Sequence, residues 1–155
     1  MGKKVVLGIG NLLMKDDGVG VRAVRALEGR FPQDVELVDG GTAGCDLLPY
    51  LQGAERIIIV DALQGGEPPG SVYRLTAQDC GKQYLNRAIS VHDMGILVLL
   101  HDLALLEGKT PPAVIIGVEP QEIGWGMELT PEVEKALPKV LELVEKEIGA
   151  AVDSK

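Results

Sequence analysis

Short runs of branched aliphatic residues recur along the chain, each bounded by glycine, proline or charged residues. Such runs are typical of strands that are buried on both faces of a sheet. The clearest is an Ile-Ile-Ile-Val run that ends in Asp61. Such runs predict strands at residues 5–9, 35–38, 56–60 and 114–118, and residues 71–75 alternate between apolar and polar like a fifth strand.

Between these runs, apolar residues recur at spacings of three and four, which indicates helices that bury one face. Residues 78–88 lack a clear pattern and are expected to form a loop or a marginal helix. The predicted helices are residues 18–31, which Pro32 ends, a short helix near 47–51, a long helix at 90–107 that Ser90 caps, and a terminal helix that starts at Thr130-Pro131.

Strands alternate with helices throughout, and this order favours a mostly parallel sheet that helices cover on both faces. We therefore expect an α/β fold, a three-layer α/β/α sandwich with a twisted sheet of about five strands. A chain of 155 residues can bury a substantial core as one unit, so residues 1–155 are expected to form a single domain.

Composition narrows the classes of protein. The chain is 46% hydrophobic and 25% charged, which is ordinary for a globular protein, and its net charge of −8 argues against binding nucleic acid through a basic face. No run approaches about 18 apolar residues, so no membrane insertion is expected. The two cysteines, Cys45 and Cys80, have no metal-binding or redox spacing, which favours a reduced cytoplasmic protein in which both are small buried residues.

Acidic residues follow the predicted strands. Asp16 and Asp17 come after the first strand, and Asp61 directly follows the third. The carboxyl ends of parallel strands share one edge of a sheet, where ligands bind in open α/β folds. If the first turn of the long helix brings His92 to this edge, two carboxylates and an imidazole converge. These donors suit a borderline divalent ion such as nickel, zinc or manganese.

Each candidate also has a structural explanation. Asp17 could cap the first helix, where a carboxylate stabilises by about 0.5–2 kcal/mol relative to alanine. Asp61 must be hydrated, hydrogen-bonded or ligated, because burying an unpaired carboxylate is unfavourable. His92 could be an ordinary residue of a helix start. His101 is excluded as its co-ligand, because with about 3.6 residues per turn it points away from His92.

The first loop also begins like a nucleotide-binding motif. Residues 8–13 start as G-x-G-x-x-G does, and Asp39 stands where a ribose-binding acid could be. The third glycine is absent and two acids would face the phosphates, so the fingerprint fails. The chain also lacks a P-loop, a G-x-S-x-G elbow and an H-E-x-x-H motif. From the residues alone, the prediction is an α/β domain with a candidate metal site.

Several short motifs together form a more specific pattern that extends over nearly the whole chain. They are Gly8-x-Gly10-Asn11, Asp16-Asp17-Gly18-x-Gly20, Asp39-Gly40-Gly41-Thr42-Ala43-Gly44, Asp61-Ala62, His92 and Gly117-Val118-x-Pro120. This pattern resembles the [NiFe]-hydrogenase maturation endopeptidases. The resemblance places the family's catalytic and metal-binding residues on Asp17, Asp61 and His92. It links substrate selection to the segment Gly40, Gly41, Thr42, Ala43 and Gly44.

The resemblance implies a metal-dependent cytoplasmic endopeptidase whose partner is the nickel-loaded precursor of the hydrogenase large subunit. Such proteins remove a short C-terminal extension after nickel insertion, which lets the new C-terminus fold over the metal centre. The Ni(II) would come with the substrate, so no resident cofactor is expected, and the protein is expected to be a monomer. Asp16 matches no family ligand and is expected to face solvent or to cap a helix.

Two other functions remain open. A nucleotide- or phosphate-binding α/β module without peptidase activity would be stabilised by nucleotides and indifferent to nickel. A non-catalytic chaperone that senses nickel on the large subunit would bind the precursor without cutting it. A cleavage assay separates this chaperone from a protease.

Overall fold

The computed structural model describes residues 3–31, 34–42, 44–76, 91–109 and 112–153, and for residues 44–45, 91–97 and 150–153 the backbone only. The strands are β1 (Lys4–Ile9), β2 (Val35–Gly41), β3 (Arg56–Ala62), β4 (Val72–Thr76) and β5 (Ala113–Val118). The helical segments are η1 (Lys15–Gly18), α1 (Val19–Ala26), η2 (Gly44–Leu47), α2 (Leu48–Leu51), α4 (Val91–Glu107) and α5 (Pro131–Asp153).

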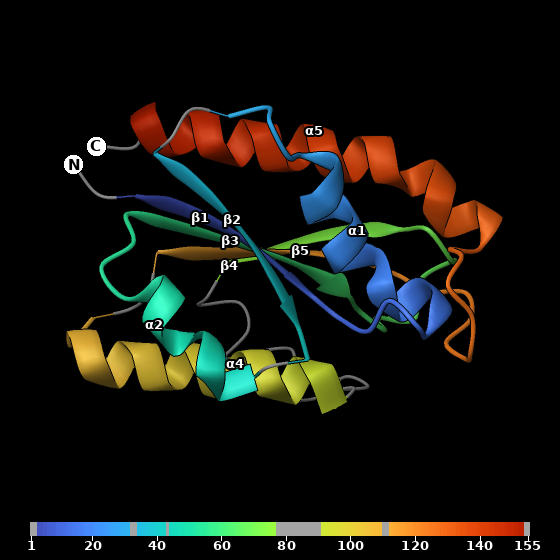
Figure 1. Cartoon of the computed structure of the whole chain (residues 1–155), viewed down its shortest axis with the longest axis horizontal. Coiled ribbons are helices and arrows are strands. Elements are labelled where there is room, and N and C mark those ends of the chain that lie inside the picture. The colour runs from blue at the N-terminus through green and yellow to red at the C-terminus, as the bar shows by residue number, and fades with distance from the viewer. Residues whose placement is uncertain (1–2, 32–33, 43, 77–90, 110–111, 154–155) are drawn as a thin grey trace.

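The strands form one sheet in the order β2-β1-β3-β5-β4. β2, β1, β3 and β5 are parallel, and β4 pairs with β5 in the antiparallel direction. Helices α1 and α5 lie on one face of the sheet and α2 and α4 on the other (Figure 1). The predicted three-layer α/β/α sandwich with a mostly parallel sheet is therefore confirmed.

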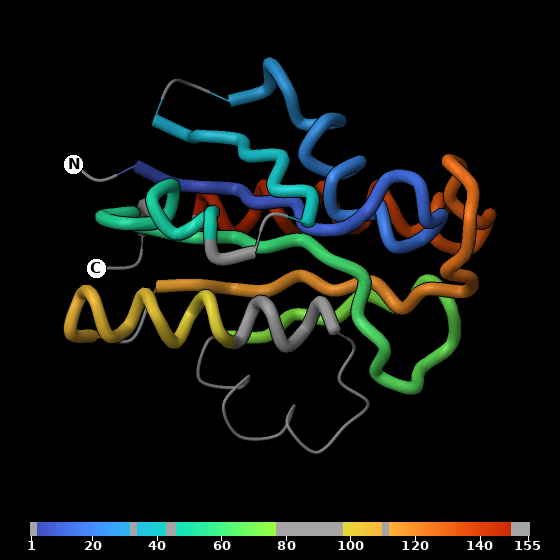
Figure 2. Tube along the Cα trace, turned by 60° about the horizontal axis from the view of Figure 1, so that its bottom comes forward, coloured from blue at the N-terminus to red at the C-terminus, as the bar shows by residue number. Residues whose placement is uncertain are grey.

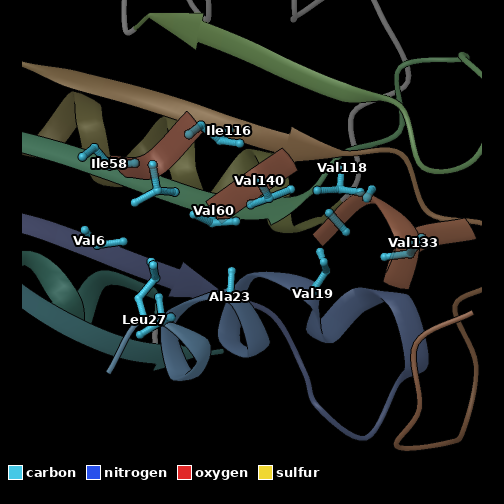
Figure 3. Close-up of a cluster of buried hydrophobic side chains, with 14 of the residues drawn as sticks. Val6, Val19, Ala23, Leu27, Ile58, Val60, Ile116, Val118, Val133 and Val140 are labelled. Carbon is cyan, nitrogen blue, oxygen red and sulfur yellow. The ribbon is translucent and has the colours of Figure 1, made fainter. Parts of the chain in front are cut away.

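Each face of the sheet has its own hydrophobic core. On one face, Val60 and Ile116 of the strands pack with Val19 of α1 and Val140 of α5 (Figure 3). On the other face, the core contains Ile59 of β3, together with buried leucines of α2 and α4. Because both faces are covered, the central parallel strands β1, β3 and β5 are mainly continuous apolar runs.

The carboxyl ends of the parallel strands lie at one end of the molecule. β1 and β3 point toward this end, and the amino end of α4 also lies there (Figure 1). The loop that leads from β1 to α1 and the loop that leads from β5 to α5 lie side by side at the same end (Figures 1 and 2). The predicted site residues of the first loop and of β3 are therefore brought to one edge.

Several element boundaries differ from the predicted ones. β2 extends to Gly41, beyond the predicted end at residue 38. α1 ends at Ala26 and does not reach residue 31. Gly29 adopts a φ of +81°, the left-handed conformation that commonly ends helices, although Leu27 remains buried in the core. β3 continues through Asp61, whose backbone pairs with Gly117 of β5. Residues 78–88, predicted to be a loop or marginal helix, lie outside the described residues.

The start of α1 packs directly on the sheet because Gly20 has no side chain. A Cβ atom at this position would lie 2.1 Å from the carbonyl oxygen of Val60 in β3 and 2.6 Å from that of Ile9 in β1. Any larger residue would therefore push η1 and α1 away from the strands.

Among the described residues, no helix is both long and apolar enough to cross a bilayer.

Candidate active site

Asp17 lies in η1, at the carboxyl end of β1. The residue is only 3% exposed, and its carboxylate accepts a hydrogen bond from the backbone N–H of Asn11 at 2.9 Å. Gly10 allows this fold-back, because its φ is +136° and a Cβ there would lie 1.9 Å from the carbonyl oxygen of Asp17. The N-cap of α1 is Gly18, without a side-chain cap. Asp17 therefore does not cap the first helix.

Asp61 is fully buried near the end of β3. One oxygen of its carboxylate accepts the backbone N–H of Ala62 at 2.8 Å. η1 contacts β3 directly, so Asp17 and Asp61 belong to neighbouring elements at one edge of the sheet. Two buried carboxylates at a ligand-binding edge are unusual, because an ionised carboxylate is expensive to take out of water unless it is compensated.

His92 is the second residue of α4, whose amino end lies at the end of the molecule that carries both carboxylates (Figure 1). Its imidazole lies outside the described side chains, so the triad stays a prediction. Among the side chains that the structure does describe, no three His, Cys, Asp or Glu form a metal-binding group.

The segment predicted to select substrate starts beside the first loop. Gly40 and Gly41 end β2, and the carbonyl oxygen of Gly41 accepts the backbone N–H of Gly10 at 2.9 Å. Thr42 follows the strand, Gly44 begins η2, and Ala43 lies outside the described residues. This hydrogen bond places the start of the glycine segment next to the turn that positions Asp17.

Other residues singled out in the sequence have simpler explanations. His101 is exposed on α4, as expected. Asp39 is partly exposed and pairs with Arg25 at 3.2 Å, which agrees with its rejection as a ribose-binding acid. The side chain of Cys45 and the whole of Cys80 lie outside what the structure describes.

The prediction that Asp16 faces solvent or caps a helix is wrong, because Asp16 is 0% exposed. Its carboxylate accepts four hydrogen bonds of 2.7–3.0 Å from the loop that follows β5. The donors are the backbone N–H groups of Gln121, Glu122 and Thr130, and the hydroxyl of Thr130. Asp16 thus ties the first loop to the last, through donors at least 105 residues away along the chain.

Glu119, the first residue after β5, is also buried. Its carboxylate accepts the backbone N–H of Gly65 at 2.8 Å and the hydroxyl of Tyr73. Burial raises the pKa of Tyr73, and its hydrogen bond to Glu119 raises that pKa further, so the phenol stays a proton donor at neutral pH. Glu119 therefore holds the loop between β3 and β4.

Comparison with known proteins identifies the family of this chain. A model of the hydrogenase maturation protease family, HycI, matches residues 21–147. The chain belongs to this family. The hydrogenase 2 maturation protease of Escherichia coli K12 is 36% identical over 143 residues, which cover 90% of this chain and 87% of that protein. The hydrogenase expression/formation protein HupD of Thiocapsa roseopersicina is 34% identical over 142 residues, or 90% of this chain. The chain spans 64% of that relative's length.

Solved structures of the family have the same fold. The hydrogenase maturating endopeptidase HybD from Escherichia coli superposes with a TM-score of 0.80 at 34% identity, covering 92% of this chain and 89% of that chain. The [NiFe] hydrogenase maturation protease HybD from Thermococcus kodakarensis gives a TM-score of 0.80 at 33% identity, covering 93% of this chain and 97% of that chain.

Family membership confirms the resemblance seen in the sequence and assigns the chain to the peptidases. It disfavours the nucleotide-binding alternative. The individual roles of Asp17, Asp61 and His92 stay predictions.

Proposed function

We propose that this protein is a cytoplasmic, monomeric endopeptidase that removes the C-terminal extension of a [NiFe]-hydrogenase large-subunit precursor after nickel insertion. The observation that carries the proposal is the pair of buried carboxylates, Asp17 and Asp61, at the ligand-binding edge of a hydrogenase maturation protease fold.

The donor types suit nickel that arrives as part of the substrate. Carboxylate oxygens and an imidazole nitrogen are ligands that borderline divalent ions accept. Asp17 and Asp61 would supply the oxygens, and His92, at the amino end of α4, would supply the nitrogen. With three protein ligands, the ion keeps positions for groups of the precursor, so binding can depend on whether nickel has been inserted.

In this proposal the chain's residues select and position the precursor. Ligation of the substrate's nickel by Asp17, Asp61 and His92 would hold the adjacent C-terminal segment at the edge of the sheet, and such positioning is itself a large part of catalysis. The glycine segment that starts at Gly40 would line the approach to this edge. The substrate's metal acts as a template for the scissile bond.

The decisive test is to mix the purified protein with nickel-free and nickel-loaded precursor and to follow release of the C-terminal extension by mass spectrometry. We expect cleavage of the nickel-loaded precursor only. Equal cleavage of both forms would contradict recognition through nickel. Binding without any cleavage would instead support the non-catalytic chaperone.

Single substitutions test the site residues. We expect Asp17→Asn, Asp61→Asn and His92→Ala each to slow processing at least about a hundredfold, since even outer-shell partners of metal ligands change metal affinity by about 10–100-fold. Circular dichroism should show a retained fold. Asp39→Asn and His101→Ala are matched controls, because they alter an exposed acid and an exposed histidine and should leave the rate unchanged. Unchanged processing in all three site variants would remove the assignment.

A further inference from the structure

The two loops at the candidate site expose a group of large apolar side chains. They are Leu13 from the first loop, at 49% exposure, and Ile123, Trp125 and Met127 from the loop after β5, at 41%, 81% and 60%. We call these four residues the Trp125 surface. Tryptophan and methionine are enriched where proteins bind each other, and a largely exposed tryptophan is the kind of anchor that dominates binding energy.

The Trp125 surface is held in place by backbone hydrogen bonds. The N–H of Gly126 donates to the carbonyl oxygen of Leu13 at 2.9 Å, and the N–H of Lys15 donates to the carbonyl oxygen of Gly126 at 2.8 Å. The four hydrogen bonds to the buried Asp16 fix the same loop from inside. The apolar side chains are therefore carried by a backbone that hydrogen bonds hold in one conformation, which lowers the conformational entropy lost on binding.

Hydrogen bonds connect the loops that carry the Trp125 surface to the candidate active site. The carboxylate of Asp17 accepts the N–H of Asn11, and the side-chain carbonyl of Asn11 accepts the N–H of Leu13, each at 2.9 Å. Leu13 in turn accepts the N–H of Gly126, which stands between Trp125 and Met127. An unbroken chain of hydrogen bonds thus links Asp17 to the Trp125 surface, and both loops lie at one end of the molecule (Figure 2).

We infer that the Trp125 surface docks the protein substrate beside its scissile segment, an inference that rests on the proposed function. A peptidase that cuts a protein must receive that protein at its active site, and these exposed apolar side chains belong to the two loops that hydrogen bonds connect to Asp17. The loop that carries Trp125 also presents the exposed acid Glu128, on a chain of net charge −8, whereas the neighbouring Glu122 pairs with Lys15 of the first loop at 2.7 Å. The complementary partner surface is therefore apolar with a basic rim.

A second pair of exposed apolar residues supplies the matched control. Leu105 and Leu106, at 70% and 58% exposure, lie at the carboxyl end of α4. That end of the helix is at the opposite end of the molecule from the two loops (Figure 1). Substitution there removes a similar apolar area without touching the edge that carries Asp17.

The first experiment measures processing of nickel-loaded precursor by Trp125→Ala, Met127→Ser and the control Leu105→Ser. For the two surface variants we expect KM to rise about tenfold or more with kcat unchanged, because a docking contact binds substrate and transition state equally. The control should retain the wild-type KM. An unchanged KM in both Trp125→Ala and Met127→Ser would overturn the inference while leaving the proposed function intact.

The second experiment detects docking without cleavage. Trp125 is the one tryptophan of the sequence, so labelling with 5-fluorotryptophan gives a single ¹⁹F resonance. We expect this resonance to shift and saturate when unlabelled nickel-loaded precursor is added. A shift with precursor that is never cleaved would support the docking surface and contradict the proposed function.

Two outcomes would overturn docking at this surface. One is a resonance that stays unmoved while the precursor is cleaved. The other is a resonance that changes only with the concentration of the protein itself, which would show that a second copy of the chain covers the surface.

Discussion

Two adjacent aspartates, Asp16 and Asp17, serve different purposes although both are buried. The carboxylate of Asp16 accepts four hydrogen bonds from the loop after β5, whereas the carboxylate of Asp17 accepts the N–H of Asn11 within its own loop. Adjacent residues of a 3₁₀ turn point about 120° apart, so one turn can direct one carboxylate inward and another toward the edge. Of this pair, Asp16 holds two loops together and Asp17 is a candidate site residue.

At this scale we predict that Asp16→Asn lowers the free energy of unfolding by about 1–3 kcal/mol, because an amide nitrogen would face buried N–H donors that need an acceptor. Urea denaturation measures the change. Asp39→Asn is the control, since its exposed ion pair with Arg25 contributes about 0–1 kcal/mol. Equal effects of the two substitutions would mean that the loop contacts of Asp16 add little stability.

At the scale of elements, close packing of η1 and α1 on β1 and β3 positions the first loop. Gly20 faces the backbone of both strands, as its contacts with Val60 and Ile9 show. The approach is between backbones, so neither neighbour can move aside without shifting a strand.

We predict that Gly20→Ala destabilises the protein by about 1–3 kcal/mol, as overpacking does, and lowers Tm by about 2–4 °C for each kcal/mol. Gly149→Ala is the opposite control. Gly149 is exposed in α5 with open space around it, so alanine should stabilise that helix by about 0.5–1 kcal/mol. Differential scanning calorimetry compares them, and a Gly20→Ala protein as stable as wild type would refute the packing argument.

Elements were predictable from sequence where local patterning decides them. Apolar runs predicted four strands and alternation predicted β4. Spacings of three and four and capping residues predicted α1, α4 and α5, although α1 ends early, at Ala26. Asp17 and Asp61 were predictable because acids directly after apolar strands stand out. The role of Asp16 was not predictable from the sequence, because its hydrogen-bond donors come from a segment far along the chain. The Trp125 surface was not predictable for the same reason, since its residues come from two loops that are distant in sequence.

For the whole molecule, one buried acid joins the last helix to the sheet. Glu147 of α5 is 6% exposed and pairs with Arg56 of β3 and with Arg74 of β4. Burial alone would raise the pKa of Glu147, but the hydrogen bonds from Arg74 and Arg56 outweigh it and hold this pKa below its ordinary value of 4.5.

Because this pKa is lowered in the folded state, ionised Glu147 stabilises the protein above pH 4.5, and that contribution is lost as pH falls through the lowered folded value. We predict that Glu147→Gln destabilises by about 1–3 kcal/mol at pH 7, as loss of hydrogen bonds to a charged group does. The difference from wild type should shrink below pH 4.5, which urea denaturation across pH 3–7 would measure. A difference that is constant with pH would exclude the ionic contribution.

The four hydrogen bonds of Asp16 also bear on the order in which the site forms during synthesis. A nascent chain that has emerged only as far as β5 contains both candidate carboxylates, Asp17 and Asp61, but none of the four donors to Asp16, which all follow β5. Contacts between segments this distant in sequence form late, because a large loop must close first. The contacts that tie the first loop to the last are therefore completed only when the chain has been made through the start of α5.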